Sequence, residues 1–582
     1  MSPGSPWAGL RVAIYTFLPG VLAGAHIGCL LFFLNPRLPF DVVSIFAAAV
    51  LYGGFLGVVT GLLQWPFLRG DEARARRWLP WGVTVALMVA ATVYAVHASR
   101  FAFYLPAGIN QRLIKAAVLL SAAALIAFYT SLLHSLHSRP YGVRSRFGLV
   151  LIAVASLYVA VERRDAYQPQ PERLRSSALG GVTERPVLVV VALESASLDA
   201  VLPLAEQGRL PFFATMLREG AGGPLDALRP YRRPAAWMSL ATGKNPYRHG
   251  VMEDRLYPLP RLGERQALTL WPAGLAFERW GLFGVGAQEV DREDQRALPL
   301  WEVLPRLGGS VGVVGWPLTS PPAPELSVVV SEAFFQSPDE RSPDEVPGAA
   351  APEEIAERAR LFRVAPEDID PVLLARFGEI VPSVVVEALA ADTWRETLSV
   401  YLLDQYPDLS AYFLALPGLR RVSEAYFGGY AAVQFDGSED EEDRQAAEAL
   451  AAYYEHLDAF LQELWEGLPR PAVLAVVSPA GARPHSLAAR LLTAAPSQGS
   501  RVDSDADGLL LVYGDGARGG ERLAEGRTVD VVPTLLWALG YPVARDMDGQ
   551  VLTPAFDTEA LGRPSLAFVP SYEAMDAPPP AR

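Results

Sequence analysis

Three carboxylates lie within five residues in the C-terminal part of the chain, at Asp503, Asp505 and Asp507, and Gly508 follows them. Alternating carboxylates before a glycine form the opening half of a Ca²⁺-binding loop, because Ca²⁺ takes oxygen ligands and glycine permits a sharp turn. The acidic residue that should close such a loop is missing, since Gly514 holds its place. An apolar strand is predicted next, where the loop type requires a helix. We therefore interpret this cluster as a solvated acidic loop.

Imidazole and thiolate groups are frequent zinc ligands, and the chain has few of them. Its single cysteine, Cys29, lies in an apolar run and is interpreted as a small buried hydrophobe. Beyond residue 185 the only histidines are His249, His456 and His485. His456 falls within a predicted amphipathic helix and His485 within a Pro-His-Ser loop, and a metal role for either is the weaker interpretation.

The most specific motif of the chain runs from Arg232 to Gly250, with the sequence Arg-Arg-Pro-Ala-Ala-Trp-Met-Ser-Leu-Ala-Thr-Gly-Lys-Asn-Pro-Tyr-Arg-His-Gly. It resembles the nucleophile loop and helix of the alkaline phosphatase superfamily, in its type I phosphodiesterase/nucleotide pyrophosphatase branch. There, a Thr or Ser directly precedes Pro-x-x-aromatic, and Thr-Gly-x-x-Pro and His-Gly follow. The matching positions are Pro234, Trp237, Thr242, Gly243, Pro246, His249 and Gly250. The nucleophile position is occupied by Arg233.

The resemblance implies a phosphate-ester hydrolase with two zinc ions, usually held by three Asp and three His. Such ligands suit Zn²⁺, which lowers the pKa of the attacking hydroxyl and neutralises phosphoryl oxygens. In this chain the ligand positions are held by Glu194, Arg420, Glu424, Pro479, Ala480 and Ser504, or Asp503 if the last register shifts by one. Arg233 stays protonated and cannot attack phosphorus. His249 matches a structural histidine of the family. We therefore expect neither an intact catalytic site nor a metal cofactor.

Two arginines would then lie where the family binds its two metal ions. In the superposed site Arg233 and Arg420 would be surrounded by Glu194 and Glu424. These four side chains could form bidentate Arg–carboxylate pairs that hold the cleft closed without metal. Such pairs are weak evidence for added stability, because desolvation offsets much of the attraction. The competing interpretation is an anion pocket, in which Arg233 and Arg420 hold a phosphate or carboxylate without cleaving it.

The elements that carry this site follow a membrane-embedded part. The chain has 582 residues, a net charge of -14 and a positive mean hydropathy. The negative charge argues against a general nucleic-acid binder, which would show a basic face. Five apolar runs approach the ~20 residues that cross ~30 Å of hydrocarbon. The runs are Val12–Leu34, Val42–Leu68, Leu79–Val96, Leu113–Leu133 and Phe147–Val161. No cleavage site follows the first run, so we expect a retained anchor.

Arginines in the connecting loops predict the orientation of these runs. One side has Arg11, Arg69, Arg74, Arg76, Arg77, Arg139, Arg144 and Arg146, and the other has Arg37, Arg100, Arg112 and Lys115. The positive-inside rule then places the N-terminus in the cytoplasm and the following domain outside, although Arg163 and Arg164 oppose this. We expect an integral protein of the inner or plasma membrane with a periplasmic domain. His26, inside the first run, is predicted to face the bundle with a hydrogen-bond partner.

We expect a transmembrane module at 1–164, a linker at 165–185, a large domain at 186–570 and a disordered tail at 571–582. Within the large domain, 257–306 is predicted to be a cap insertion and 337–354 an acidic loop. Strands are predicted at Val187–Leu193, Gly222–Leu228, Ser310–Trp316, Leu409–Leu416, Pro471–Val477 and Leu509–Tyr513. The first is a continuous β-branched run, typical of a parallel strand buried on both faces. The resemblance implies an α/β, alkaline phosphatase-like fold whose mostly parallel sheet lies between helices.

The favoured function is a membrane-anchored, non-catalytic scaffold or binding subunit of a membrane assembly. Its expected partners are the lipid bilayer and other membrane proteins, and no nucleic acid. One alternative is an active metal-dependent phosphodiesterase or phosphotransferase with displaced ligands at Glu194, Glu424 and Asp503–Asp507. Another is that the helical module acts as a channel or handles lipids, but no spanning run carries several charges.

Overall fold

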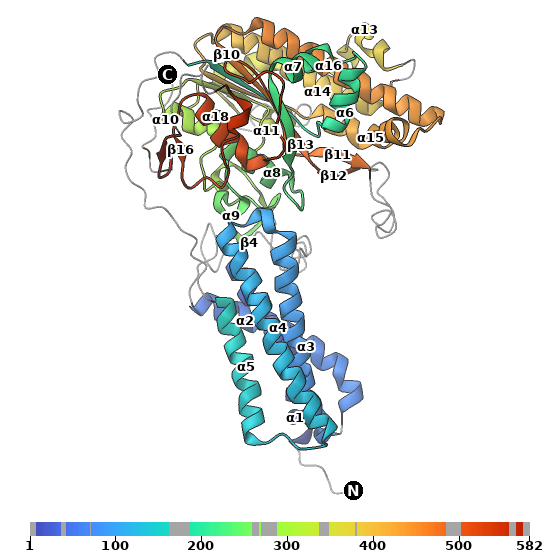
Figure 1. The fold of residues 1–582 in the computed structure, drawn as a ribbon, viewed down its shortest axis with the longest axis vertical. Coiled ribbons are helices and arrows are strands. Elements are labelled where there is room, and N and C mark those ends of the chain that lie inside the picture. Colours follow the sequence, from blue (N-terminus) through green and yellow to red (C-terminus); the bar gives the residue numbers. More distant parts are fainter. Residues whose placement is uncertain are drawn as a thin grey trace. The chain divides into compact units, whose positions relative to one another are not determined.

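The computed structural model describes residues 7–35, 42–69, 71–161, 185–258, 267–268, 288–336, 349–378, 381–484, 502–557, 566–573 and 575 (Figure 1). The chain divides into two compact units. One comprises residues 1–168 with 255–289, and the other comprises 169–254 with 290–582. Of the predicted linker at 165–185, only the last residue lies within the described part.

The first unit contains a helix at each of the five predicted apolar runs. These are α1 (Ala8–Leu34), α2 (Val42–Leu68), α3 (Glu72–Arg100), α4 (Ala107–Leu136) and α5 (Val143–Val161), with η1 (Ala102–Tyr104) between α3 and α4. By length and composition, four helices of the described chain can cross a membrane, α1 to α4. Helix α5 has 19 residues and is not among them. This unit also includes β3 (Arg255–Pro258), β4 (Ala267–Leu268) and β5 (Gln288–Glu289), which pair antiparallel.

Small and polar residues determine how the N-terminal helices pack. A Cβ on Gly24 of α1 would lie 2.2 Å from the carbonyl oxygen of Tyr52 on α2, so only glycine permits this approach. His26 is fully buried, and its Nε2 lies 3.0 Å from the Ser156 hydroxyl on α5. The prediction that His26 faces the bundle with a partner is therefore confirmed. Cys29 is buried, as predicted.

The second unit is built on a sheet with strand order β14-β2-β13-β10-β1-β9-β6-β7-β8, in which β15 also pairs with β2. Five adjacent strands run parallel: β10 (Ala472–Ser478), β1 (Val187–Leu193), β9 (Ala411–Leu416), β6 (Val311–Val314) and β7 (Val328–Val330). Strands β13 (Gly508–Gly514) and β2 (Ala221–Asp226) continue the sheet antiparallel beyond β10. The predicted mostly parallel sheet is confirmed.

Helices cover both faces of this sheet, which explains why β1 has no polar side chain (Figure 1). Val189 and Val191 pack on one face, and Val190 and Ala192 on the other. The first face is covered by α6 (Leu198–Glu206), α7 (Pro211–Glu219), α14 (Ser383–Gln405), α15 (Gly418–Asp436) and α16 (Glu441–Gly467). The second face is covered by α8 (Arg233–Thr242), α10 (Leu300–Arg306) and α18 (Val531–Ala538).

Shorter elements complete the second unit. The helices and turns are α9 (Pro246–His249), η5 (Arg292–Asp294), α11 (Glu332–Gln336), α12 (Glu353–Leu361), η7 (Pro366–Asp368), α13 (Pro371–Leu374), η8 (Ala375–Phe377), η9 (Thr528–Asp530) and η10 (Thr553–Ala555). The strands are β8 (Ala350–Ala351), β11 (Gly481–Pro484), β12 (Val502–Ala506), β14 (Glu521–Arg522), β15 (Gly526–Arg527), β16 (Val543–Ala544) and β17 (Phe568–Val569).

Two predicted segment boundaries differ from the structure. The predicted cap at 257–306 extends too far, because Trp301 and Leu304 of α10 lie in the hydrophobic core. The predicted tail at 571–582 begins too early, since Tyr572 and Met575 are buried. In both places large apolar side chains pack in the core beside the sheet. The composition of these segments did not indicate that they would be buried. Residues 337–348 of the predicted acidic loop lie outside the described part.

Candidate functional site

The candidate site lies at the carboxyl ends of the parallel strands, where open α/β sheets bind their ligands. Glu194 directly follows β1, and Glu332 begins α11 just after β7. Arg420 lies in the first turn of α15, which follows β9. Arg233 is the first residue of α8, where the following proline is favourable because its missing amide is not needed.

These side chains form one continuous ion-pair network. Arg233 binds Glu332 through two bonds, from Nη2 to Oε1 at 2.6 Å and from Nη1 to Oε2 at 3.2 Å. Its Nε donates to Glu194 Oε1 at 2.8 Å. Arg420 Nε lies 3.4 Å from the same Glu194 oxygen, and its Nη1 donates to Glu424 Oε1 at 2.7 Å. The structure thus links all four residues of the predicted charge cluster and adds Glu332.

Burial of Glu194 distinguishes its ion pairs from those at the surface. The Glu194 side chain is 1% exposed, whereas those of Arg233 and Arg420 are 28% and 36% exposed. Burial opposes the charge on Arg233, but Glu194 and Glu332 outweigh it and raise the pKa of the guanidinium above its ordinary value. The three carboxylates of the network exceed its two guanidinium groups by one charge. The anion pocket at Arg233 and Arg420 remains a prediction, and these carboxylates would compete with any anion.

Sequence reasoning missed two members of this region, Glu332 and Arg395. Glu332 follows a short Val-Val-Val strand, the same pattern of an apolar strand and then a Glu that marks Glu194. Arg395 lies on α14 and is 4% exposed, and its guanidinium carbon is 4.0 Å from the ring centre of Phe335 on α11. A Cβ on Gly315 would come within 3.0 Å of Arg395 Nε, so this glycine makes room for the arginine.

The remaining predicted positions lie outside this network. Pro479 and Ala480 follow β10, and the buried Ala480 carries no group that could bind a metal. Ser504 belongs to β12, but its side chain lies outside the described part of the structure. Asp507, from the acidic cluster, pairs with Arg229 and accepts a hydrogen bond from a backbone amide.

The two histidines of the large domain that the structure describes have structural contacts. His249 is fully buried, accepts from the Val251 amide at Nδ1 and lies 3.1 Å from the Ser239 hydroxyl through Nε2. Burial and the nearby Lys244 lower the pKa of His249 to about 3, so it stays neutral. His456 lies on α16, with its Nε2 3.1 Å from Glu396. His485 lies outside the described residues.

The described side chains at the carboxyl edge do not fit a pair of zinc ions. No group of three or more His, Cys, Asp or Glu side chains within the described ranges is arranged to hold a metal ion. Around Glu194 the neighbouring positions are held by guanidinium groups, which have no lone pair to offer a metal. Glu194 and Glu332 already bind Arg233.

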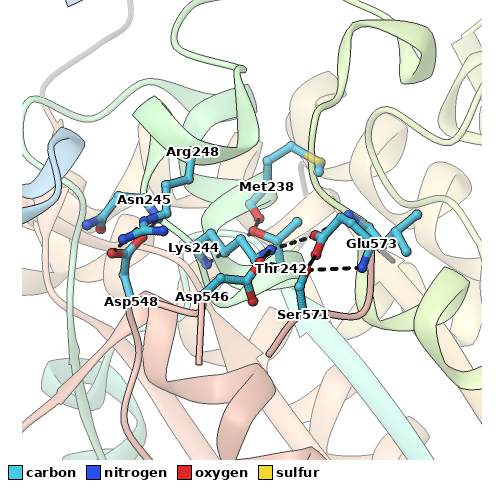
Figure 2. A network of polar contacts seen from close by, with 10 residues as sticks. Met238, Thr242, Lys244, Asn245, Arg248, Asp546, Asp548, Ser571 and Glu573 are labelled. Carbon is cyan, nitrogen blue, oxygen red and sulfur yellow. Dashed lines mark hydrogen bonds and ion pairs between the residues drawn. The ribbon is translucent and has the colours of Figure 1, made fainter. Parts of the chain in front are cut away.

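The Thr-Gly-Lys-Asn-Pro part of the motif turns the chain after α8 and is anchored by the end of the domain (Figure 2). Gly243 ends α8 with a φ of 68°, a left-handed conformation that favours glycine. The buried Lys244 ammonium donates to Asp546 at 2.6 Å and to Glu573 at 2.5 Å, and the Ser571 hydroxyl contacts both carboxylates. The part of the motif that matches the family therefore positions the helix that begins at Arg233.

Several solved structures resemble the chain at low identity. Phosphonoacetate hydrolase from Sinorhizobium meliloti 1021, in complex with phosphonoformate, is 17% identical with a TM-score of 0.31, over 52% of this chain and 58% of the hydrolase. This chain thus spans little more than half of that enzyme. Human ectonucleotide pyrophosphatase/phosphodiesterase 5 is 11% identical with a TM-score of 0.38, over 63% and 98% of the two chains. Wild-type alkaline phosphatase PafA is 10% identical with a TM-score of 0.41, over 65% and 100%.

These values are too low to support any argument about activity. No curated protein sequence matches the chain significantly. Residues 188–535, however, match the family model described as type I phosphodiesterase/nucleotide pyrophosphatase, and the match includes β1, α8, α15 and β10. Since this match covers more than half of the chain, the protein belongs to the type I phosphodiesterase/nucleotide pyrophosphatase family.

Proposed function

We propose that this chain is a membrane-anchored, non-catalytic member of its family that serves as a scaffold or binding subunit of a membrane assembly. The observation that supports this most directly is the ion pairing of Arg233 with Glu194 and Glu332. A guanidinium holds its proton and cannot act as the nucleophile that this position supplies in the family. Glu194 and Glu332, the two carboxylates that contact Arg233, each give it at least one oxygen.

Electrostatic repulsion gives a second reason to expect no metal chemistry. A dication at about 4 Å from a guanidinium is repelled by roughly 8 kcal/mol at an effective dielectric constant of about 20. Two guanidinium groups, from Arg233 and Arg420, lie against the same oxygen of Glu194, Oε1. A zinc ion at this oxygen would have to displace at least one of them, and the displaced arginine would keep only its second carboxylate, Glu332 or Glu424.

Hydrolysis of bis(p-nitrophenyl) phosphate by the full chain in detergent tests the loss of catalysis. With zinc added, we expect no turnover above that of a Glu194→Ala variant prepared in the same way. Turnover that a chelator abolishes and that Glu194→Ala lacks would overturn the proposal. It would favour the displaced-ligand enzyme that uses Glu194, Glu424 and Asp503–Asp507. In that case Ser195→Ala shows whether the hydroxyl beside Glu194, on a residue with a φ of 73°, is the nucleophile.

The anchoring helices support a membrane location, and the loop arginines support an orientation with the second unit outside. A membrane-impermeant maleimide can test the orientation, because Cys29 is buried and should react little. Gln462 and Arg76 are both exposed, on α16 and α3. We expect Gln462→Cys to be labelled in intact spheroplasts and Arg76→Cys only after permeabilisation. The opposite pattern would reverse the proposed topology.

A scaffold must have a partner, which copurification in mild detergent can detect. We expect a stoichiometric membrane protein complex that is recovered when either member carries the affinity tag. A chain that is isolated as a monomer from native membranes under several mild detergents would contradict the scaffold role. This experiment is independent of the turnover assay, so the two parts of the proposal can fail separately.

A further inference from the structure

One buried carboxylate, on α14, has hydrogen bonds to both α15 and α16. Asp392 on α14 is fully buried, and its two oxygens lie 3.0 and 3.2 Å from the amide nitrogen of Gly418. Gly418 is the first residue of α15. The Tyr453 hydroxyl on α16 donates to Asp392 Oδ2 at 2.8 Å. The carboxylate therefore occupies the N-terminal end of α15, where the helix dipole favours negative charge.

The contact between α14, α15 and α16 leaves no space for a side chain at Gly418. A Cβ on Gly418 would lie 2.0 Å from the Tyr453 hydroxyl and 2.5 Å from Asp392 Oδ2. Arg420, which reaches Glu194, follows Gly418 by two residues, and Glu424 lies one turn further along the same helix. The position of Arg420 therefore depends on how firmly the first turn of α15 is held.

We propose that Asp392 is a positioning residue for the ion-pair network, and that ionisation of its carboxyl fixes the first turn of α15 and with it Arg420. Protonation removes the charge that attracts the amide of Gly418. It also changes the bond to Tyr453, because a protonated carboxyl can donate its only proton where it formerly accepted one. The inference deepens the proposed function, since it concerns the same site and the groups that regulate it.

The groups around Asp392 place this ionisation near neutral pH. Burial raises the pKa of Asp392 to about 7, and the neighbouring Glu396 adds to the increase. Arg395 on the same helix, Tyr453 on α16 and the amide of Gly418 act in the opposite direction. His456 on α16 lies beside Glu396, with 3.1 Å between Nε2 and Oε1, and it also interacts electrostatically with Asp392.

Hydrogen exchange of the full chain in detergent, read on peptides that cover residues 418–424 and corrected for intrinsic rates, tests the proposal. In the wild type we expect protection to rise by about tenfold between pH 5.5 and pH 8, the difference between a neutral and a charge-assisted hydrogen bond. Asp392→Asn should hold protection at the low level across this range. A flat wild-type profile, or a pH dependence that survives in Asp392→Asn, would overturn the proposal.

Two further variants keep the test informative if Asp392→Asn does not fold. Tyr453→Phe removes a donor to the ionised carboxylate and should move the midpoint of the transition to higher pH. His456→Gln should keep the transition but move its midpoint to higher pH, because the imidazole interacts electrostatically with Asp392 as well as with Glu396. Loss of the transition in this variant would contradict the assignment to Asp392. None of these readouts depends on turnover, so the inference can fail while the non-catalytic proposal stands, and the reverse.

Discussion

Replacing Arg233 with methionine should destabilise the second unit strongly. The change removes the hydrogen-bonded partner of Glu194, whose side chain is 1% exposed, and leaves a buried carboxylate with only the more distant Arg420. Breaking a buried ion pair by removing one partner costs about 3–5 kcal/mol. An unfolding entropy of about 2.1 cal/mol/K per residue over roughly 380 residues of this unit converts that loss to a decrease in Tm of about 4–6 °C.

Thermal unfolding of the full chain in detergent, followed by tryptophan fluorescence, measures this shift. Arg218→Met is the matched control, because Arg218 pairs with Glu219 at 2.8 Å but both side chains are more than half exposed. Exposed pairs contribute about 0–1 kcal/mol, so the control should melt close to the wild type. In the double variant with Glu194→Gln, most of the Arg233→Met loss should be recovered. Equal, small shifts for Arg233→Met and Arg218→Met would refute the reasoning.

Two further predictions concern the ion pairs of Lys244 and the close packing at the start of α15. Lys244→Met should also lower Tm, because it removes the cation that pairs with the buried Asp546 and the more exposed Glu573. Burial opposes the charge on Glu573, but the ammonium of Lys244 outweighs it and lowers the pKa of Glu573 from 4.5 to about 2. The stabilisation by this ion pair is therefore complete above pH 4.5 and is lost as the pH falls from there towards 2. Lys244→Met should lack that part of the acid dependence in a pH series of melting curves. Gly418→Ala should lower the free energy of unfolding by at least about 1–3 kcal/mol, because the new Cβ would overlap with Tyr453. Gly467→Ala is the control and should be neutral or slightly stabilising, because its Cβ would meet nothing within 4 Å. Equal effects of the two substitutions would contradict the close packing at the start of α15.

Elements with a strong pattern of their own could be predicted from the sequence. Val187–Leu193 forms β1 with the predicted bounds, because an uninterrupted apolar run rich in valine suits a strand covered on both faces. Helix α7 (Pro211–Glu219) also has a local cause, since proline begins it and its apolar residues recur at helical spacing. The five apolar runs also form helices, because their length and composition permit little else.

Elements whose identity depends on tertiary contacts could not be predicted in this way. Strand β7 has three residues and gains its place only by pairing with β6 and β8. Glu332 follows it, so the carboxylate that makes two hydrogen bonds to Arg233 was not identified in advance. Asp392 and Arg395 lie within α14, and charged residues on a helix are usually exposed, but both are buried because α15 and α11 pack against them.

The ion pairs between Arg233, Glu194 and Arg420 were expected because the resemblance to a known family placed these positions in one site, whereas the residue types alone specify no contact. The resemblance could not reveal Glu332. The place of Ser504 could not be predicted either. It lies on β12, which pairs with β11 in a hairpin whose register shifts near Gly481, and such a shift breaks the regular spacing on which an alignment depends.

Zinc content of the purified full chain tests the central claim most directly. The protein would be incubated with zinc in detergent, freed of excess metal and analysed by elemental mass spectrometry beside a Glu194→Ala variant. If guanidinium groups have replaced the metal chemistry, the wild type should hold no more zinc than the variant. Stoichiometric zinc that the wild type retains and Glu194→Ala loses would contradict the account.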